Sequence, residues 1–203
     1  SIQVFTNNVS NFSIFRISTT NGTFTNFIIQ SRNLTKGQTW SAMVWIGDGS
    51  DNSTYQNTSE ILIANTPPAF QVNPVINSTD GTNRTTVNLN VYFTPNETDV
   101  NDLANLNYSV QVFTNNRTNF TLYNIATTNG TFTQFIIQSR NLTKGQTWTA
   151  QVYITDGTDN STLINTSELL ILNSDPRFSI NPVINSTLGT NLTSENLTVY
   201  FIG

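Results

Sequence analysis

A fixed offset of 108 residues relates the first part of the sequence to the second. Residues 19–40 and 127–148 match at every position except one, where Asn26 is replaced by Gln134. The match continues on both sides at the same offset, so the chain must contain copies of one structural unit. Because a unit of this length can bury a core of its own, we expect tandem domains and not the thin repeats of a solenoid.

Residue types and their alternation predict an all-β fold. Thr, Asn, Ser, Ile, Val and Phe dominate, and these residues favour strands or turns over helices. Residues 1–18 contain two short apolar runs around an Asn-Asn pair, which predicts a hairpin. Residues 23–30 predict a further strand, and alternating apolar residues from Trp148 to Ile154 predict a half-buried one.

Two proline-containing pairs, Pro67-Pro68 and Asp175-Pro176, stand at equivalent positions after the last strand of a unit. Proline lacks a backbone donor and has a fixed φ, so we place domain junctions there. Residues 67–174 then form one complete unit with roughly seven strands, as expected for a β-sandwich. Residues 1–66 form a unit that lacks its first two strands, and residues 175–203 supply the first strands of a third unit.

The corner before the penultimate strand of the unit carries a family resemblance. Leu142 to Trp148 is followed by Val152, Ile154 and the pair Asp156-Gly157. This pattern resembles the immunoglobulin-like, fibronectin type III-like and cadherin-like modules that occur in tandem in surface proteins of archaea and bacteria. The resemblance implies tandem immunoglobulin-like β-sandwiches with an extracellular or cell-surface role.

The chain begins and ends inside a unit, because Ser1 aligns with Ser109 and Gly203 aligns with Pro95. Two full repeats would contain 216 residues, 13 more than the chain has, and the difference corresponds to the acidic loop 96–108. A half-built sandwich exposes sheet edges and an open core, which is unfavourable in water. We therefore expect neighbours to complete the terminal units, either as separate copies joined head to tail by strand complementation or as consecutive repeats of one longer polypeptide.

N-glycosylation motifs are the densest chemical signal in the chain, and eight pairs of them obey the repeat offset. A chain rich in Asn, Ser and Thr also produces such motifs by chance. The functional interpretation is an extracellular surface covered by N-glycans, which would supply the solubility that a charged fraction of only 10% does not. The candidate sites are Asn8, Asn11, Asn21, Asn33, Asn52, Asn57, Asn77, Asn83, Asn96, Asn107, Asn116, Asn119, Asn129, Asn141, Asn160, Asn165, Asn185, Asn191 and Asn196.

Acidic and amide side chains gather in two loops that an immunoglobulin-like sandwich places at the same end. Oxygen ligands of this kind bind Ca²⁺, so a calcium site is one interpretation. The candidate ligands are Glu97, Asp99, Asn101, Asp102, Asp156 and Asp159. The alternative interpretation is that these residues form turns, a common role of Asp and Asn in loops. We expect no other cofactor besides covalent glycans.

Several functions are disfavoured by what the chain lacks. Without His or Cys it has no Ser-His or Cys-His nucleophile and no zinc cluster. A net charge of −4 without a basic stripe argues against a nucleic-acid partner. No apolar run approaches the roughly 18 residues of a membrane span. Glu60 and Glu168 recur at a strand start, where solvent exposure explains them better than a glycan-cleaving carboxylate pair does.

The sequence therefore predicts a non-enzymatic structural subunit of an extracellular, glycosylated filament or surface layer, whose partners are other copies of itself. The competing hypothesis is a calcium-stiffened stalk of a cell-surface adhesin. Met43 and Trp45 point away from the inward residues of their strand, and we expect them at an interface.

Overall fold

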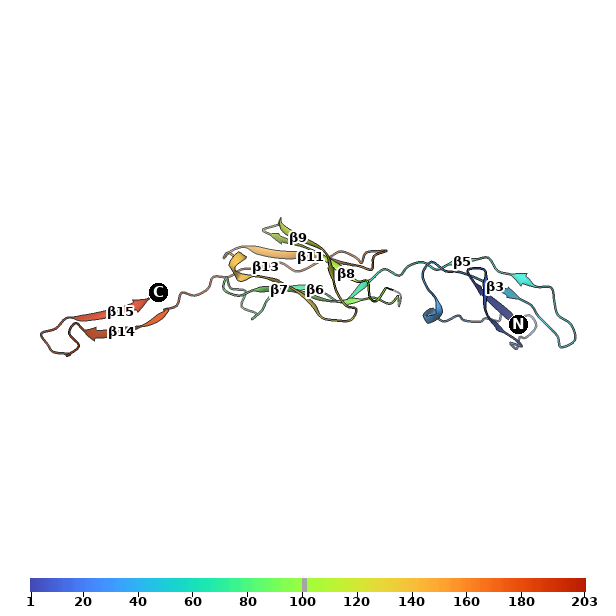
Figure 1. Ribbon diagram of the computed structural model, residues 1–203, viewed down its shortest axis with the longest axis horizontal. Coiled ribbons are helices and arrows are strands. Elements are labelled where there is room, and N and C mark those ends of the chain that lie inside the picture. Colours follow the sequence, from blue (N-terminus) through green and yellow to red (C-terminus); the bar gives the residue numbers. More distant parts are fainter. Residues whose placement is uncertain (100–101) are drawn as a thin grey trace.

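The computed structural model describes residues 1–99 and 102–203, which form three bodies in a row (Figure 1). We call them the N-terminal unit (residues 1–66), the middle unit (67–174) and the C-terminal hairpin (175–203). Nearly all regular structure is β, which confirms the predicted fold class. The only helical elements among the described residues are two short turns, and none of these residues form a helix long and apolar enough to cross a bilayer.

The middle unit is a sandwich of two antiparallel sheets. The three-stranded sheet has the order β10-β7-β6 and consists of β6 (Ala69–Ser78), β7 (Leu89–Asn96) and β10 (Thr133–Ile137). The other sheet has the order β12-β11-β8-β9, and β13 also pairs with β11. Its strands are β8 (Asn107–Thr114), β9 (Arg117–Ala126), β11 (Thr147–Thr155), β12 (Ile164–Asn165) and β13 (Leu169–Leu170). Because β12 and β13 are two pieces of one edge strand, this is a seven-strand immunoglobulin-like arrangement.

Inward side chains of the two sheets fill the core of the middle unit. Alternate residues of β11, from Trp148 to Ile154, are buried as predicted, and Leu89, Val91 and Phe93 of β7 meet them from the other sheet. The ring of Phe93 makes edge contacts with neighbouring aromatic rings on both sides. The fold of this unit therefore depends on both sheets.

The N-terminal unit has one sheet, in the order β2-β1-β3-β4, with β5 also paired to β3. Its strands are β1 (Ile2–Thr6), β2 (Val9–Ile14), β3 (Thr39–Val44), β4 (Gln56–Asn57) and β5 (Ile61–Leu62). The predicted hairpin is confirmed, and its turn residues Asn7 and Asn8 have φ of 51° and 63°. Asparagine tolerates these left-handed values, which suit a two-residue hairpin turn. The short helical turns η1 (Ser31–Asn33) and η2 (Ser139–Asn141) are repeat copies of each other.

The predicted strand over residues 23–30 is wrong for the N-terminal unit, where these described residues contain no strand. Its repeat copy in the middle unit does form β10, which pairs with β7. Residues 1–66 contain no counterpart of β7 that this segment could pair with. The missing partner strand is the physical reason for the difference, because an isolated strand leaves its backbone groups without a ladder.

The C-terminal hairpin consists of β14 (Ile180–Ser186) and β15 (Leu197–Ile202), paired antiparallel with each other. By the repeat offset these strands are the counterparts of β6 and β7. Figure 1 shows them extending away from the middle unit without a covering sheet.

Candidate assembly surfaces and inter-unit joint

The inner face of the N-terminal sheet is covered only in part: Val4 and Trp40 are buried, whereas two other residues of this face are exposed. Ile46 is 65% exposed, whereas its repeat copy Ile154 is 0% exposed. Ile61 is 63% exposed, whereas its copy Leu169 is 7% exposed. In the middle unit β6 and β7 cover this face, so at Ile46 and Ile61 the N-terminal unit presents an apolar surface where its copy has a core.

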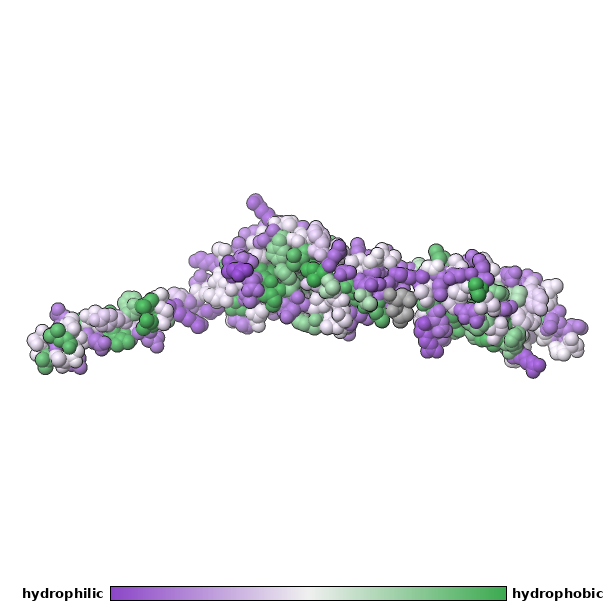
Figure 2. Space-filling model, viewed as in Figure 1, coloured by the Kyte–Doolittle hydropathy of each residue, from purple (hydrophilic) through white to green (hydrophobic). Residues whose placement is uncertain are grey.

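The C-terminal hairpin presents the opposite surface. Leu197 and Phe201 are 65% and 61% exposed, whereas their copies Leu89 and Phe93 are 0% and 1% exposed. Figure 2 shows apolar residues on the surface of this thin element. Such a two-stranded hairpin is marginally stable alone in water, and it exposes side chains that the middle unit buries.

These two surfaces correspond to the two halves of one sandwich. In the middle unit β7 pairs with β10, with Tyr92 opposite Gln134. The repeat offset makes Tyr200 of the hairpin and Asn26 of the N-terminal unit the equivalent pair. The middle unit is therefore a template for how a hairpin and an open sheet of this sequence fit together.

A lysine from the N-terminal unit crosses to the middle unit and forms part of the joint between them. Lys36 follows η1, and its Nζ lies 2.5 Å from Asp102 Oδ2 and donates to Thr158 Oγ1 at 2.7 Å. The hydrogen bond to Asp102 raises the pKa of Lys36 above its ordinary value of 10.5, against the opposing effect of burial. Asp102 is 3% exposed, so the ammonium neutralises a nearly buried carboxylate.

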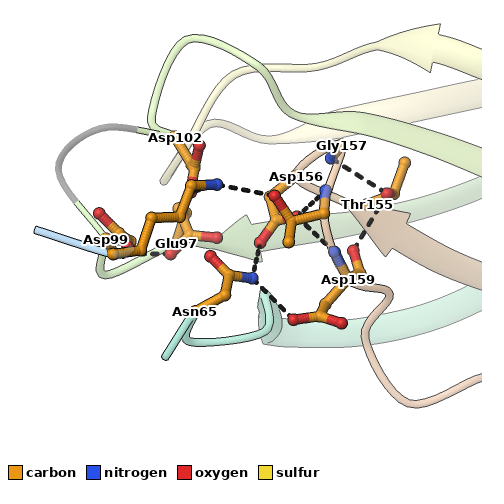
Figure 3. Close-up of polar contacts among 10 residues, drawn as sticks. Asn65, Glu97, Asp99, Asp102, Thr155, Asp156, Gly157 and Asp159 are labelled. Atoms are coloured by element: carbon orange, nitrogen blue, oxygen red, sulfur yellow. Dashed lines mark hydrogen bonds and ion pairs between the residues drawn. The ribbon is translucent and has the colours of Figure 1, made fainter. Parts of the chain in front are cut away.

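An asparagine just before β6 forms the second contact of the joint. Asn65 Nδ2 donates to Asp156 Oδ2 at 2.8 Å and to Asp159 Oδ2 at 2.9 Å, and Figure 3 shows it between these two residues. Asp156 Oδ1 accepts the backbone N–H groups of Thr158 and Asp159, which close the turn after β11. Burial raises the pKa of Asp156, but these hydrogen bonds outweigh it and the pKa lies below its ordinary value of 3.8.

A third set of contacts orders the start of the acidic loop. Asn129 accepts the backbone N–H of Glu97 at 2.7 Å and donates to its carbonyl at 2.9 Å. The Glu97 side chain is buried, and its Oε1 accepts the backbone N–H of Asp99 at 2.6 Å. Its Oε2 is buried without a hydrogen-bond partner among the described residues.

Five of the six candidate calcium ligands lie at this joint (Figure 3). Glu97, Asp99, Asp102, Asp156 and Asp159 all lie in the region drawn in Figure 3, whereas Asn101 lies outside the described residues. The described residues contain no group of three or more carboxylates that could hold a metal ion in this arrangement. Lys36 provides the positive charge next to Asp102, so Ca²⁺ does not fit here while the ammonium stays. The calcium site stays a prediction.

The candidate glycosylation sites are distributed over all three bodies. All 19 asparagines lie in the described residues, and 16 are exposed. The three half-buried ones are Asn83, Asn107 and Asn129, and the Asn129 amide is engaged with Glu97. The geometry therefore favours modification at most of the motifs and disfavours it at these three.

The outward aromatic residue Trp45 belongs to a small cluster on the outer face of the N-terminal sheet. Its ring makes edge contacts with Phe15 and Tyr55, at centroid distances of 5.9 Å and 5.4 Å. Edge contacts of this kind stabilise aromatic pairs. Intramolecular packing thus explains part of this outward placement, and the predicted interface role of Met43 and Trp45 stays a prediction.

Lys36 and Asn65 are the joint residues that sequence reasoning missed. Both obey the repeat, since Lys144 and Asn173 stand 108 residues later. The signal available in the sequence was that a lysine, an asparagine and an acidic turn all recur at the repeat offset. Lys36 and Asn65 both contact the acidic turn of the next unit and not that of their own unit, so the pairing becomes visible only when consecutive units are placed end to end.

Comparisons with known proteins add only a broad likeness in structure. No known protein family and no curated protein sequence matches the chain. Among solved structures, it is similar to the FN1–FN3 domains of chicken CNTN1, with 8% identity and a TM-score of 0.38 over 83% of this chain and 63% of that one. It is also similar to the chicken interferon gamma receptor alpha chain, with 14% identity and a TM-score of 0.41 over 70% of each chain. The chain thus spans less than two thirds of the CNTN1 fragment, and likenesses of this size do not transfer a function.

Proposed function

We propose that the chain is a non-enzymatic structural subunit of an extracellular, glycosylated filament or surface layer. Its units assemble head to tail, and the hairpin of one copy completes the N-terminal sandwich of the next. The observation that carries the proposal is the exposure of Leu197, Phe201 and Ile46, whose repeat copies form the core of the middle unit.

The driving force for this assembly is hydrophobic burial. Each Val, Leu, Ile or Phe side chain that moves from an exposed to a buried site contributes about 1.5–3 kcal/mol. Completion also allows residues 25–29 to pair with β15 as β10 pairs with β7. The contact is heterologous, since one surface binds a different surface on the next copy, and it therefore propagates into a fibre.

The proposal is tested by placing a charge on either face of the hairpin. Leu197→Asp puts a carboxylate where Leu89 is buried in the middle unit, so we expect it to abolish assembly in sedimentation and electron microscopy. Thr198→Asp is the matched control, because alternate residues of a strand point to opposite faces and Thr198 corresponds to the outward Asn90. Deletion of residues 175–203 should likewise leave unassembled monomer. Fibres that form equally well with Leu197→Asp would overturn the proposal.

The same assembly constrains the glycans. Asn196 corresponds to Asn88, which is half-buried and whose Oδ1 accepts the backbone N–H of Ser139 at 2.8 Å. Asn185 corresponds to Asn77, which is exposed. In native material we expect mass spectrometry to find glycan on Asn185 and none on Asn196. Full glycan occupancy at Asn196 in assembled fibres would contradict completion by the hairpin.

One observation favours the alternative role as a calcium-stiffened adhesin stalk, namely the buried Glu97 Oε2 without a partner among the described residues. In that case Glu97, Asp102 and Asp156 would hold Ca²⁺ after Lys36 has moved away. Calcium titration distinguishes the roles, because a stalk should melt at a higher temperature with Ca²⁺ and at a lower one with chelator. A core-sharing filament should show little change with either.

A further inference from the structure

The joint between the N-terminal and middle units shows how a hairpin is fixed to the sandwich that it completes. Asn65 stands just before the β6-β7 hairpin and clamps the carboxylates of Asp156 and Asp159. Those carboxylates belong to the turn that ends β11 of the same sandwich. The asparagine therefore ties the start of the incoming hairpin to the opposite sheet.

The repeat places the same parts at the two ends of the chain. Asn173 stands in front of the C-terminal hairpin as Asn65 stands in front of β6. Asp48 and Asp51 are the copies of Asp156 and Asp159, and we call residues 48–51 the carboxylate turn. Asn173, Asp48 and Asp51 are all exposed, so both halves of this contact are accessible.

The carboxylate turn already has the geometry of its copy. Asp48 Oδ1 accepts the backbone N–H groups of Ser50 and Asp51 at 2.9 Å and 3.0 Å. The corresponding distances at Asp156 are 2.7 Å and 2.8 Å. Binding an asparagine amide would therefore need little rearrangement of this turn.

In the joint between the N-terminal and middle units a lysine accompanies the asparagine, and this lysine also has a repeat copy. Lys36 Nζ donates to Thr158 Oγ1, and the equivalent residues are Lys144 and Ser50. Lys144 is exposed. The position equivalent to Asp102 is not among residues 1–66, so the comparison covers the contacts of Asn65 and the contact of Lys36 with Thr158. Among these contacts the Asn65 amide makes two hydrogen bonds and the Lys36 ammonium makes one.

We propose that Asn173 and Lys144 of one copy bind the carboxylate turn of the next copy, the same copy whose N-terminal sandwich the hairpin completes. This inference rests on the proposed function. We call the contacts of Asn173 and Lys144 with the carboxylate turn the polar latch. The latch sets the register, because a slip of the hairpin by two residues would move Asn173 by roughly 7 Å and break both hydrogen bonds. Apolar side chains alone define that register less sharply.

A double-mutant cycle on the full, unglycosylated chain tests the latch. Asn173→Ala and Asp51→Ala should each raise the critical concentration for assembly by about 10- to 100-fold, as expected for a lost hydrogen bond to a charged group. The double variant should be no weaker than the weaker single variant, because both changes remove the same contact. Asp159→Ala is the matched control, since it loosens only the internal joint and should leave the critical concentration unchanged.

The outcomes separate the latch from the assembly on which it rests. Unchanged critical concentrations in the single variants, or a double variant weakened by the product of the two effects, would overturn the latch and leave the filament intact. Assembly that survives Leu197→Asp, or a wild-type chain that never assembles, would overturn the filament and the latch together.

Discussion

Residues 25–29 and 133–137 differ only at Asn26 and Gln134, yet they have different structures. Residues 133–137 form β10, with Ile137 buried and Ile136 half-buried, whereas residues 25–29 form no strand, and the copies Ile29 and Ile28 are half-buried and 66% exposed. The neighbouring strands differ, because only residues 133–137 have β7 beside them. The comparison teaches that this sequence needs both sheets to fold fully, and that the N-terminal unit has only one of them.

The largest expected difference between the two regions lies in paired core substitutions. Leu89→Asp buries a charge in the middle unit and should lower the free energy of unfolding by about 4–5 kcal/mol or more. Leu197→Asp changes an exposed copy of the same residue, so the unfolding of the monomeric chain should change by less than about 0.5 kcal/mol. Thermal and denaturant unfolding of monomers would measure both, and equal destabilisation would break the comparison.

A smaller difference is expected at the copies Asn129 and Asn21. Asn129 makes two hydrogen bonds to the backbone of Glu97, so Asn129→Ala should destabilise the middle unit by about 1–3 kcal/mol. Asn21 is exposed, and Asn21→Ala should change stability by less than about 0.5 kcal/mol. Denaturant unfolding of unglycosylated protein would measure the difference. A measurable loss at Asn21 would show that the N-terminal unit orders this loop in the same way.

The smallest expected effect is the response to pH of the joint between the N-terminal and middle units. The lowered pKa of Asp156 means that its contribution is complete above pH 3.8 and is lost as the pH falls through the lower folded value. The raised pKa of Lys36 means that its contribution is complete below pH 10.5 and is lost as the pH rises through the higher folded value. Small-angle scattering should therefore show a rigid joint between these limits and bending beyond them. Asn65→Ala should weaken the acid response, and an unaltered response would exclude the Asn65 contact as its cause.

Much of the fold could be predicted from the sequence, because its signals are local. The Asn7-Asn8 turn and the alternation from Trp148 to Ile154 depend on neighbouring residues, and the structure confirms both. The strand over residues 23–30 could not be excluded in the same way, because its formation depends on a distant partner. Local pattern carries no information about whether that partner is present in the same unit.

The joint was predictable only in part for the same reason. An immunoglobulin-like arrangement brings the loop with Asp102 and the turn with Asp156 to one end of the sandwich, and this much followed from the sequence. The position of Lys36 depends on how one unit stacks on the next, which no local pattern specifies. The structure shows the Lys36 ammonium next to Asp102, a contact that the sequence did not indicate.

The most direct measurement of the central claim is a disulfide between copies. Tyr92 and Gln134 are paired in the middle unit, so Tyr200→Cys in one copy and Asn26→Cys in another should bring two thiols opposite each other in a chain that has no cysteine of its own. Mixing the two variants under mild oxidation should give cross-linked pairs of copies, whereas Asn26→Cys mixed with Ile202→Cys, two residues out of register, should not. Fibres that form without the first cross-link, or with both equally, would contradict completion of one copy by the hairpin of the next.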